Sequence, residues 1–191
     1  MPHEEKNYKP YIELLKKWQN SINLISNFDV NNIYDRHILD SIKLSNYIKK
    51  YFDENTKIID IGSGAGFPGM ILAIEGFKNI NLIESNHKKT AFLNIIKNLY
   101  NLSGVEIYNE RVETLKNRAK IITSRAFKSI KETFEKTKNI TNQETNFILL
   151  KGSTVNQEII EAKNYYKFQY KLIKNLQSNG YIIHIENVTK L

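Results

Sequence analysis

A short apolar run that leads straight into a glycine-rich segment constrains this chain more than any other feature. Ile58-Ile59-Asp60-Ile61 is followed by Gly62-Ser63-Gly64-Ala65-Gly66 and then by Phe67-Pro68-Gly69. Glycine adopts positive φ angles and lets a ligand approach the backbone without meeting a Cβ, and proline suits the first turn of a helix. The sequence therefore predicts a buried strand, a tight turn open to a ligand, and a helix.

Short β-type runs alternate with helical stretches after Asn55. We expect strands over residues 57–61, 80–84, 105–109, 120–124 and 146–150, and the clearest helix over 88–100, where Ala91, Ile95 and Leu99 are four apart. Such alternation is typical of βαβ units, whose helices cover both faces of a mostly parallel sheet. Residues 166–173 and 181–188 are expected to form a terminal antiparallel pair, joined by a turn at Ser178-Asn179-Gly180.

Two amphipathic helices are expected before the sheet. Apolar side chains recur at spacings of three and four in the first: Tyr11, Leu14, Leu15 and Trp18. In the second, at about residues 32–50, Tyr34, Ile38 and Ile42 share one face, and Arg36, Asp40 and Lys43 lie on the opposite face. We expect a single domain over residues 1–191, with 1–52 as an N-terminal helical addition and 56–191 as the α/β core.

Composition narrows the classes of function. The chain has no cysteine, which excludes disulfides, thiolate metal sites and a cysteine nucleophile, and no metal site is predicted. No apolar run approaches the roughly 20 residues that a membrane-spanning helix needs, and the first residues lack the apolar core of a secretory signal. A cytoplasmic, monomeric enzyme is the expectation, with no membrane partner.

The charge balance favours a polyanionic partner. Lys and Arg number 28 against 20 Asp and Glu, giving a net charge of +8, and cationic surfaces gain affinity for nucleic acid by releasing counterions. The chain is also rich in Lys, Asn and Ile, as an A+T-biased genome would make it. Charge is therefore an indication of RNA binding that needs support from the motifs.

The spacing of the glycines favours S-adenosylmethionine over a dinucleotide. Dinucleotide-binding folds use G-x-G-x-x-G at the pyrophosphate, whereas this chain has G-x-G-x-G at Gly62, Gly64 and Gly66, with Asp60 two residues earlier. A carboxylate there would repel a pyrophosphate but would accept a hydrogen bond from an ammonium group. Glu84 ends the second predicted strand and would accept hydrogen bonds from ribose hydroxyls, a feature that NAD shares. The alternative is a glycine turn that only connects strand and helix.

Missing motifs narrow the acceptor of the methyl group. Methylation at C5 of a pyrimidine normally uses a cysteine nucleophile, and radical mechanisms use a cysteine-held cluster. Enzymes acting on exocyclic amines carry an Asn/Asp-Pro-Pro-aromatic segment after the fourth strand, where this chain has Ser124-Arg125-Ala126-Phe127. An acceptor nitrogen with a free lone pair needs neither feature. It needs no proton-transfer residue, so no catalytic acid or base is predicted, and alignment and desolvation suffice.

Several further segments occur in a fixed order with the glycine loop. They are Trp18 with Asn23-Leu24-Ile25; Arg36-His37-Ile38-Leu39-Asp40-Ser41; Glu84-Ser85 with Lys88-Lys89 and Phe92-Leu93; Arg111-Val112-Glu113; Ser124-Arg125-Ala126; and Lys151-Gly152. Together with Phe67-Pro68-Gly69, this set resembles the bacterial ribosomal RNA small subunit methyltransferase G family, also called glucose-inhibited division protein B. The resemblance covers residues 18–152.

The resemblance implies a Rossmann-like class I methyltransferase fold that methylates N7 of a guanine in small-subunit (16S) ribosomal RNA, free or in the assembled subunit. By position it assigns cofactor contacts to Gly62, Phe67, Val112, Glu113 and Arg125. Phe67 and Val112 would flank the adenine, and the Glu113 stretch would reach the base. The chain departs from the family after Gly152, since Gly180 is followed by Tyr181 where the family commonly has a basic residue.

Several side chains keep alternative roles at this stage. Arg125 would bind the cofactor carboxylate, bind an RNA phosphate or form a structural ion pair. Contact with an anion is favoured over contact with the reacting base, because the guanine becomes cationic when N7 is methylated and a guanidinium against it would oppose the reaction. Arg36 and His37 would contact RNA or help to assemble the site. Alternatively, Arg36 would pair with Asp40 at the surface, and His37 would cap or fill the junction between the helix and the domain. The remaining candidates for RNA contact are Lys88, Lys89 and Lys151, each otherwise a solvated lysine, and Phe127, which would stack on a base or lie in the core. His3 and His184 are expected to be structural.

Three other functions compete with this interpretation. A methyltransferase of a small molecule or a protein would share the cofactor loop. A nicotinamide-dependent oxidoreductase is disfavoured by the glycine spacing and by the lack of a second domain. A non-catalytic RNA-binding module would keep the basic surface, but it would leave Asp60 and Glu84 without a role.

Overall fold

The computed structural model describes residues 3–174 and 180–191, with side chains from residue 7 onward. Two of the three residues of the predicted turn, Ser178 and Asn179, and the side chain of His3 lie outside the described residues. Within the described part, no helix combines the length and the apolar character needed to cross a membrane.

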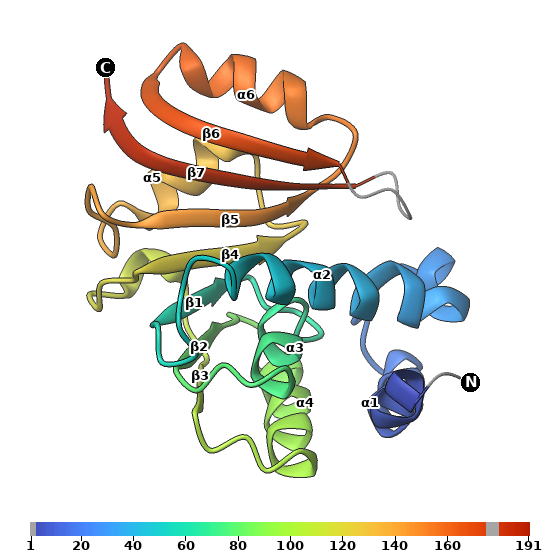
Figure 1. Cartoon of the computed structure of the whole chain (residues 1–191). Coiled ribbons are helices and arrows are strands. Elements are labelled where there is room, and N and C mark those ends of the chain that lie inside the picture. The colour runs from blue at the N-terminus through green and yellow to red at the C-terminus, as the bar shows by residue number, and fades with distance from the viewer. Residues whose placement is uncertain (1–2, 175–179) are drawn as a thin grey trace.

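One seven-stranded sheet organises the chain (Figure 1). Its strands are β1 (Ile58–Ile61), β2 (Ile80–Ile83), β3 (Val105–Tyr108), β4 (Ile121–Arg125), β5 (Asn146–Lys151), β6 (Tyr166–Lys174) and β7 (Tyr181–Lys190). The strand order is β3-β2-β1-β4-β5-β7-β6; the first five strands are parallel, and β7 is antiparallel to both β5 and β6. The mostly parallel sheet with its terminal antiparallel pair is confirmed, and each predicted strand is present with its ends shifted by at most two residues.

Helices cover both faces of the sheet, which explains why its inner strands are buried and mostly apolar. Every residue of β1 and β2 is buried, as expected for parallel strands between two helical layers. The side chains of α3 (Gly69–Ile74) and α4 (His87–Leu99) join the core on one face, and those of α5 (Ile130–Thr137) and α6 (Val155–Lys163) join the core on the other.

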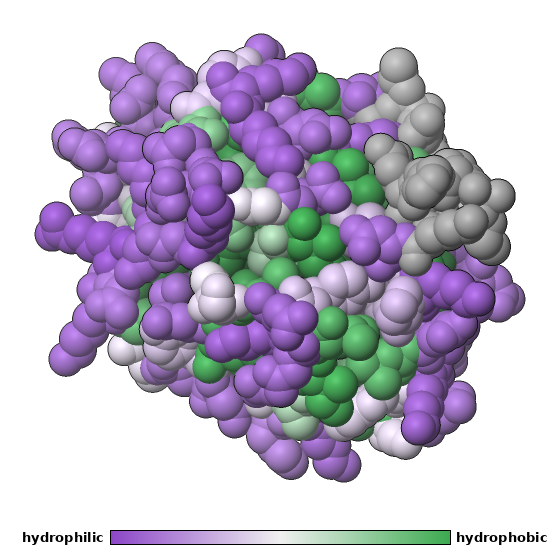
Figure 2. Space-filling view, turned by 60° about the horizontal axis from the view of Figure 1, so that its bottom comes forward, coloured by the Kyte–Doolittle hydropathy of each residue, from purple (hydrophilic) through white to green (hydrophobic). Residues whose placement is uncertain are grey.

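The predicted helix over residues 88–100 is confirmed as α4, but its apolar stripe does not face the core. Ile95 and Leu99 are 39% and 45% exposed, whereas Phe92, Leu93 and Ile96 are buried. Both stripes have helical spacing, so periodicity alone did not choose between them. Figure 2 shows that apolar patches lie between hydrophilic side chains on one face of the molecule.

Both predicted N-terminal helices are present. The first is α1 (His3–Gln19). The second is helical without a break over residues 33–48, where a π-turn η2 (Tyr34–Ile38) runs into α2 (Leu39–Ile48), and a 3₁₀ turn η1 (Asn27–Asn32) comes before it. The π-turn was not predicted. A π-turn holds an extra residue and rotates the helix that comes after it, so Asp40 is buried rather than on the outward face with Arg36.

The N-terminal helices share the core of the sheet. Tyr8, Tyr11 and Leu15 of α1 and Leu44 of α2 are buried in the same apolar cluster as α3 and α4. α1 thus packs beside α3 and α4, on the face of the sheet that α2 also covers (Figure 1).

Candidate functional site

The glycine loop forms the turn that its sequence predicts. Gly62, Gly64 and Gly66 have φ angles of 65°, 54° and 93°, in the left-handed region where a Cβ is strained. The Gly66 amide donates to the Ser63 carbonyl at 2.7 Å. Pro68 directly precedes the first residue of α3, close to the first-turn position expected for it. The loop lies at the carboxyl end of β1, where ligands bind in open parallel sheets.

Asp60 lies beneath this loop, fully buried. Its Oδ1 accepts a hydrogen bond from the Thr123 hydroxyl at 3.0 Å, and its Oδ2 has no hydrogen-bond partner. Burial raises the pKa of Asp60 to about 7. A Cβ added at Gly69 would lie 2.8 Å from Oδ2, so α3 begins directly against the carboxyl group. The predicted contact between Asp60 and an ammonium group stays a prediction.

Glu84 connects the ends of β1 and β2. Its Oε2 accepts from the Gly64 amide at 3.0 Å, and its Oε1 accepts from the Asn86 amide at 2.8 Å. The residue is 9% exposed and faces a cleft of about 220 Å³. The carboxylate thus fixes the glycine loop and borders an open volume at the same time.

We call this volume the cofactor cleft. It is lined by Gly62, Ile83, Glu84, Ser85, Glu110, Arg111, Val112, Glu113, Phe127, Lys128 and Lys136. Val112 and Glu113 come from η3 (Val112–Thr114). A hydrogen bond from Lys136 lowers the pKa of Glu113. The structure therefore brings Gly62, Glu84, Val112 and Glu113 together, as the sequence predicts.

Phe67 lies away from the cofactor cleft. Its ring is 5% exposed and is stacked with two other rings, Tyr11 at 5.5 Å and His37 at 5.0 Å between centroids. Both partners belong to the N-terminal helical segment. A contact between Phe67 and the adenine of the cofactor stays a prediction.

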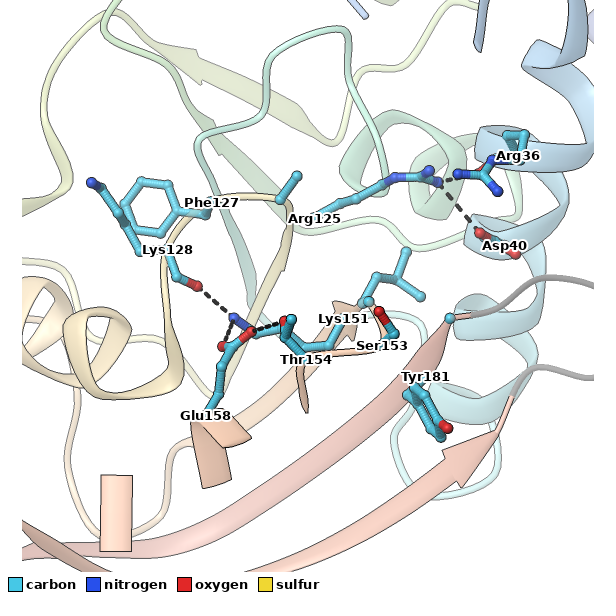
Figure 3. A pocket seen from close by; sticks show the side chains of 14 residues that line it. Arg36, Asp40, Arg125, Phe127, Lys128, Lys151, Ser153, Thr154, Glu158 and Tyr181 are labelled. Carbon is cyan, nitrogen blue, oxygen red and sulfur yellow. Dashed lines mark hydrogen bonds and ion pairs between the residues drawn. The ribbon is translucent and has the colours of Figure 1, made fainter. Parts of the chain in front are cut away.

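A second and larger opening, of about 600 Å³, lies beside the first (Figure 3). We call it the basic cleft. Its lining is Arg36, Asp40, Arg125, Ala126, Phe127, Lys128, Leu150, Lys151, Gly152, Ser153, Thr154, Glu158, Gly180 and Tyr181. Four cationic side chains thus face two carboxylates. Phe127 and Lys128 also line the cofactor cleft, so the two openings share a wall.

Arg125 makes a structural ion pair in the basic cleft. It reaches from the end of β4 towards the helical segment, where its Nη1 lies 3.5 Å from Asp40 Oδ2 and donates to the Arg36 carbonyl (Figure 3). Of its three possible roles, the ion pair is the one present in this structure. A contact with the cofactor or with RNA stays a prediction.

Asp29, which sequence reasoning missed, anchors Arg36 and His37. Arg36 Nε lies 3.3 Å from Asp29 Oδ1, and His37 Nε2 lies 3.4 Å from Asp29 Oδ2. Arg36 is therefore paired with Asp29, whereas a surface pair with Asp40 was the expected alternative. Burial and then the charge of Arg125 lower the pKa of His37 to about 4, so the ring is neutral near pH 7. The Ser-x-x-Asp spacing of Ser26 and Asp29, with a hydrogen bond of 2.8 Å, was the available signal.

The three candidate lysines lie in different surroundings. Lys151 Nζ donates to Glu158 at 2.7 Å and to the Lys128 carbonyl, and its side chain is 8% exposed. It is neither a solvated lysine nor free to reach RNA in this conformation. Lys88 is exposed and Lys89 half-buried at the start of α4, where the Asn86 side chain accepts from both of their amides.

His184 has the structural role expected of it. Its Nδ1 lies 3.0 Å from the Tyr47 hydroxyl, and its Nε2 lies 2.8 Å from Asn146 Oδ1. These contacts join α2 to β5 and β7. Burial lowers the pKa of His184.

The sequence matches known proteins over nearly its whole length. The profile of the family described as rRNA small subunit methyltransferase G matches residues 4–184. A protein named ribosomal RNA small subunit methyltransferase G from Rickettsia prowazekii is 41% identical over 179 residues, which cover 93% of this chain and 91% of the relative. The protein of the same name from Orientia tsutsugamushi is 39% identical, covering 94% and 88%.

Solved structures share the fold at low sequence identity. Magnesium protoporphyrin IX methyltransferase from Synechocystis, solved with bound SAM, has a TM-score of 0.67 and 10% identity, covering 93% of this chain and 97% of its own. An rRNA methylase from Streptococcus thermophilus has a TM-score of 0.55 and 10% identity, covering 79% and 95%. At such identities the likeness shows the class I methyltransferase fold alone.

Proposed function

Because this chain belongs to the ribosomal RNA small subunit methyltransferase G family, we propose that it transfers a methyl group from S-adenosylmethionine to N7 of a guanine in small-subunit ribosomal RNA. The observation that carries the proposal is the shared wall between the cofactor cleft and the basic cleft. A methyl donor in one and an RNA base in the other would meet at Phe127.

The residues present fit S-adenosylmethionine as cofactor. Gly62 has no Cβ, and one added there would lie 2.5 Å from the Phe127 ring, so only glycine leaves space at this point of the cleft. Glu84 keeps lone pairs for two ribose hydroxyls beyond the amides it already accepts. Three carboxylates and three cations line the cleft, so the free acceptor positions of Glu84, and not the net charge, carry this fit.

Alignment is the contribution that we assign to this chain. When bound, S-adenosylmethionine supplies an electrophilic methyl group that a guanine N7 lone pair attacks without first losing a proton. The residues then need only to hold the base in line and exclude water. Phe127 is suited to stacking on a base, and its backbone is set by Ala126, whose φ is 50°.

The RNA backbone would meet the exposed cations around the basic cleft. The side chains of Arg36 and Lys128 are 45% and 47% exposed, and Arg125 would join them by exchanging Asp40 for a phosphate. Lys88 and Lys89 would extend the contact along the start of α4. We expect a monomer acting in the cytoplasm, where small ribosomal subunits are found.

Transfer of a labelled methyl group tests the proposal. The acceptors are small subunits that lack the modification, naked small-subunit rRNA, and bulk protein. Label is expected in one or both RNA samples. It should lie at a position where borohydride reduction followed by aniline cleaves the RNA strand, as happens at 7-methylguanosine. Label only in protein would contradict the RNA substrate, and labelled RNA without cleavage would contradict the N7 position.

Thermal stability in the presence of ligands tests the cofactor independently. S-adenosylhomocysteine is expected to raise the melting temperature because it binds only the folded chain, and NAD is expected to leave it unchanged. Stabilisation by NAD alone would instead indicate an oxidoreductase.

A further inference from the structure

α1 makes direct contact with the glycine loop, more than 50 residues away in sequence. Tyr11 is fully buried, and its hydroxyl donates to the Ala65 carbonyl at 2.6 Å. A Cβ at Gly66 would collide with the same hydroxyl. The N-terminal helix therefore touches the loop backbone at two successive residues.

The ring of Tyr11 also supports the end of the loop. It is stacked on Phe67 at 5.5 Å with 14° between the planes, and His37 is also stacked on Phe67, at 5.0 Å and 27°. Phe67 directly follows Gly66, so the N-terminal segment contacts the loop through a hydrogen bond and through stacked rings. The α/β core holds Ser63 and Gly64 through the Ile83 carbonyl and the Glu84 carboxylate, whereas the Ala65 carbonyl is held by Tyr11.

We propose that Tyr11 is a positioning residue for the cofactor site, holding the glycine loop in the shape that receives the ligand. Three glycines at positive φ give the unfolded loop many alternative conformations, so fixing it costs conformational entropy. A buried hydrogen bond to Ala65 offsets this cost before the ligand arrives, which strengthens ligand binding. The inference rests on the proposed function, since it takes this loop to be the cofactor site.

The chain contains a matched control on the same helix. Tyr8 is 1% exposed, and its hydroxyl donates to Glu75 Oε1 at 2.6 Å, past the far end of α3. Tyr8→Phe and Tyr11→Phe therefore each remove one hydroxyl and one hydrogen bond of the same length from α1. Only Tyr11→Phe changes a contact with the glycine loop.

Calorimetric titration of both variants with S-adenosylhomocysteine tests the proposal at a temperature where both are folded. Tyr11→Phe is expected to raise Kd about 3- to 10-fold, the range of a single hydrogen bond, and Tyr8→Phe by less than about twofold. Equal Kd values for the two variants would overturn the positioning role. A wild-type chain that binds no S-adenosylhomocysteine would instead overturn the proposed function, and this inference with it.

Hydrogen exchange gives a second readout that needs no ligand. The Gly66 amide donates to Ser63 within the loop, and its exchange is expected to accelerate in Tyr11→Phe and not in Tyr8→Phe. Both variants should lose global stability, since Tyr11→Phe loses a buried hydrogen bond to a carbonyl and Tyr8→Phe a part-buried one to a carboxylate. Unchanged Gly66 exchange in Tyr11→Phe would show that the loop holds its shape without α1.

Discussion

The two clefts hold their central charged side chains in different ways, although they share a wall. In the cofactor cleft, Glu84 accepts from the Asn86 amide at its own strand end and from the Gly64 amide at the end of β1. In the basic cleft, Arg125 and Lys151 are paired with Asp40 and Glu158, which come from separate helices. Backbone amides thus hold Glu84, and side-chain ion pairs hold Arg125 and Lys151.

This difference decides which side chains are free to bind. A carboxylate that accepts one amide on each oxygen still has acceptor capacity for a ligand. A buried cation with a carboxylate partner binds another anion only by exchanging that partner, because losing it alone would leave an uncompensated charge. A buried basic residue that is paired with a carboxylate is therefore weaker evidence for RNA contact than an exposed, unpaired one.

Glu84→Ala should give the largest effect and tests the first half of the comparison. Loss of two charged hydrogen bonds to the ribose, about 3–6 kcal/mol, should weaken S-adenosylhomocysteine about 1000-fold, measured by calorimetric titration. Glu110→Ala is the control, since Glu110 lines the same cleft but accepts from Thr114. Similar losses in both variants would mean that net charge, not hydrogen bonding, governs the site.

Lys151→Ala tests whether the basic cleft is structural. It leaves Glu158 largely buried without its cation, and should lower the free energy of unfolding by about 3 kcal/mol in urea. Lys128→Ala should change it by less than about 0.5 kcal/mol, because the side chain of Lys128 is 47% exposed. Unchanged stability of Lys151→Ala with weaker RNA binding would restore Lys151 as an RNA contact.

Arg125 and Asp40 should be coupled in a double-mutant cycle. The two side chains are 18% and 12% exposed, so alanine at both positions should cost less than the sum of the single changes, with a coupling of about 1–2 kcal/mol in unfolding free energy. Methyl transfer by Arg125→Ala should fall while its fold persists. Additive changes in unfolding free energy, together with unchanged methyl-transfer kinetics, would contradict both the ion pair between Arg125 and Asp40 and the role of Arg125 in methyl transfer.

His37 should make stability depend on pH below neutrality. Its folded pKa of about 4 lies below the ordinary histidine value of 6.5, so between these values the unfolded chain binds a proton that the native chain excludes. Stability should therefore fall as pH drops from 6.5 to 4, by up to about 1.4 kcal/mol per pH unit. Urea titrations of His37→Asn should show a flatter profile in this window; an identical profile would assign the titration to another group.

Lys88→Ala should give the smallest effect, in RNA binding alone. An exposed lysine at a phosphate contributes about one counterion, so the slope of log K against log salt should decrease by about 1, with stability unchanged. Lys97→Ala, at the other end of α4, is the control. Equal slopes for the two variants would remove the start of α4 from the RNA surface.

Sequence reasoning succeeded where one segment carries its own signal. The glycine loop, the strand runs and Glu84 at a strand end follow from neighbouring residues, and the structure forms each of them. It could not predict contacts between distant segments. Neither the packing of Phe67 against Tyr11 and His37 nor the π-turn before Asp40 has a local signal in the sequence.

The sequence by itself determined the parallel sheet, the turn at its edge and the family, because apolar periodicity and glycine spacing act over a few residues. Only the tertiary structure decided which charges are paired, which stripe of α4 is buried and that α1 supports the glycine loop. Those outcomes depend on distances between segments that lie far apart along the chain, and burial and charge pairing are settled by these distances.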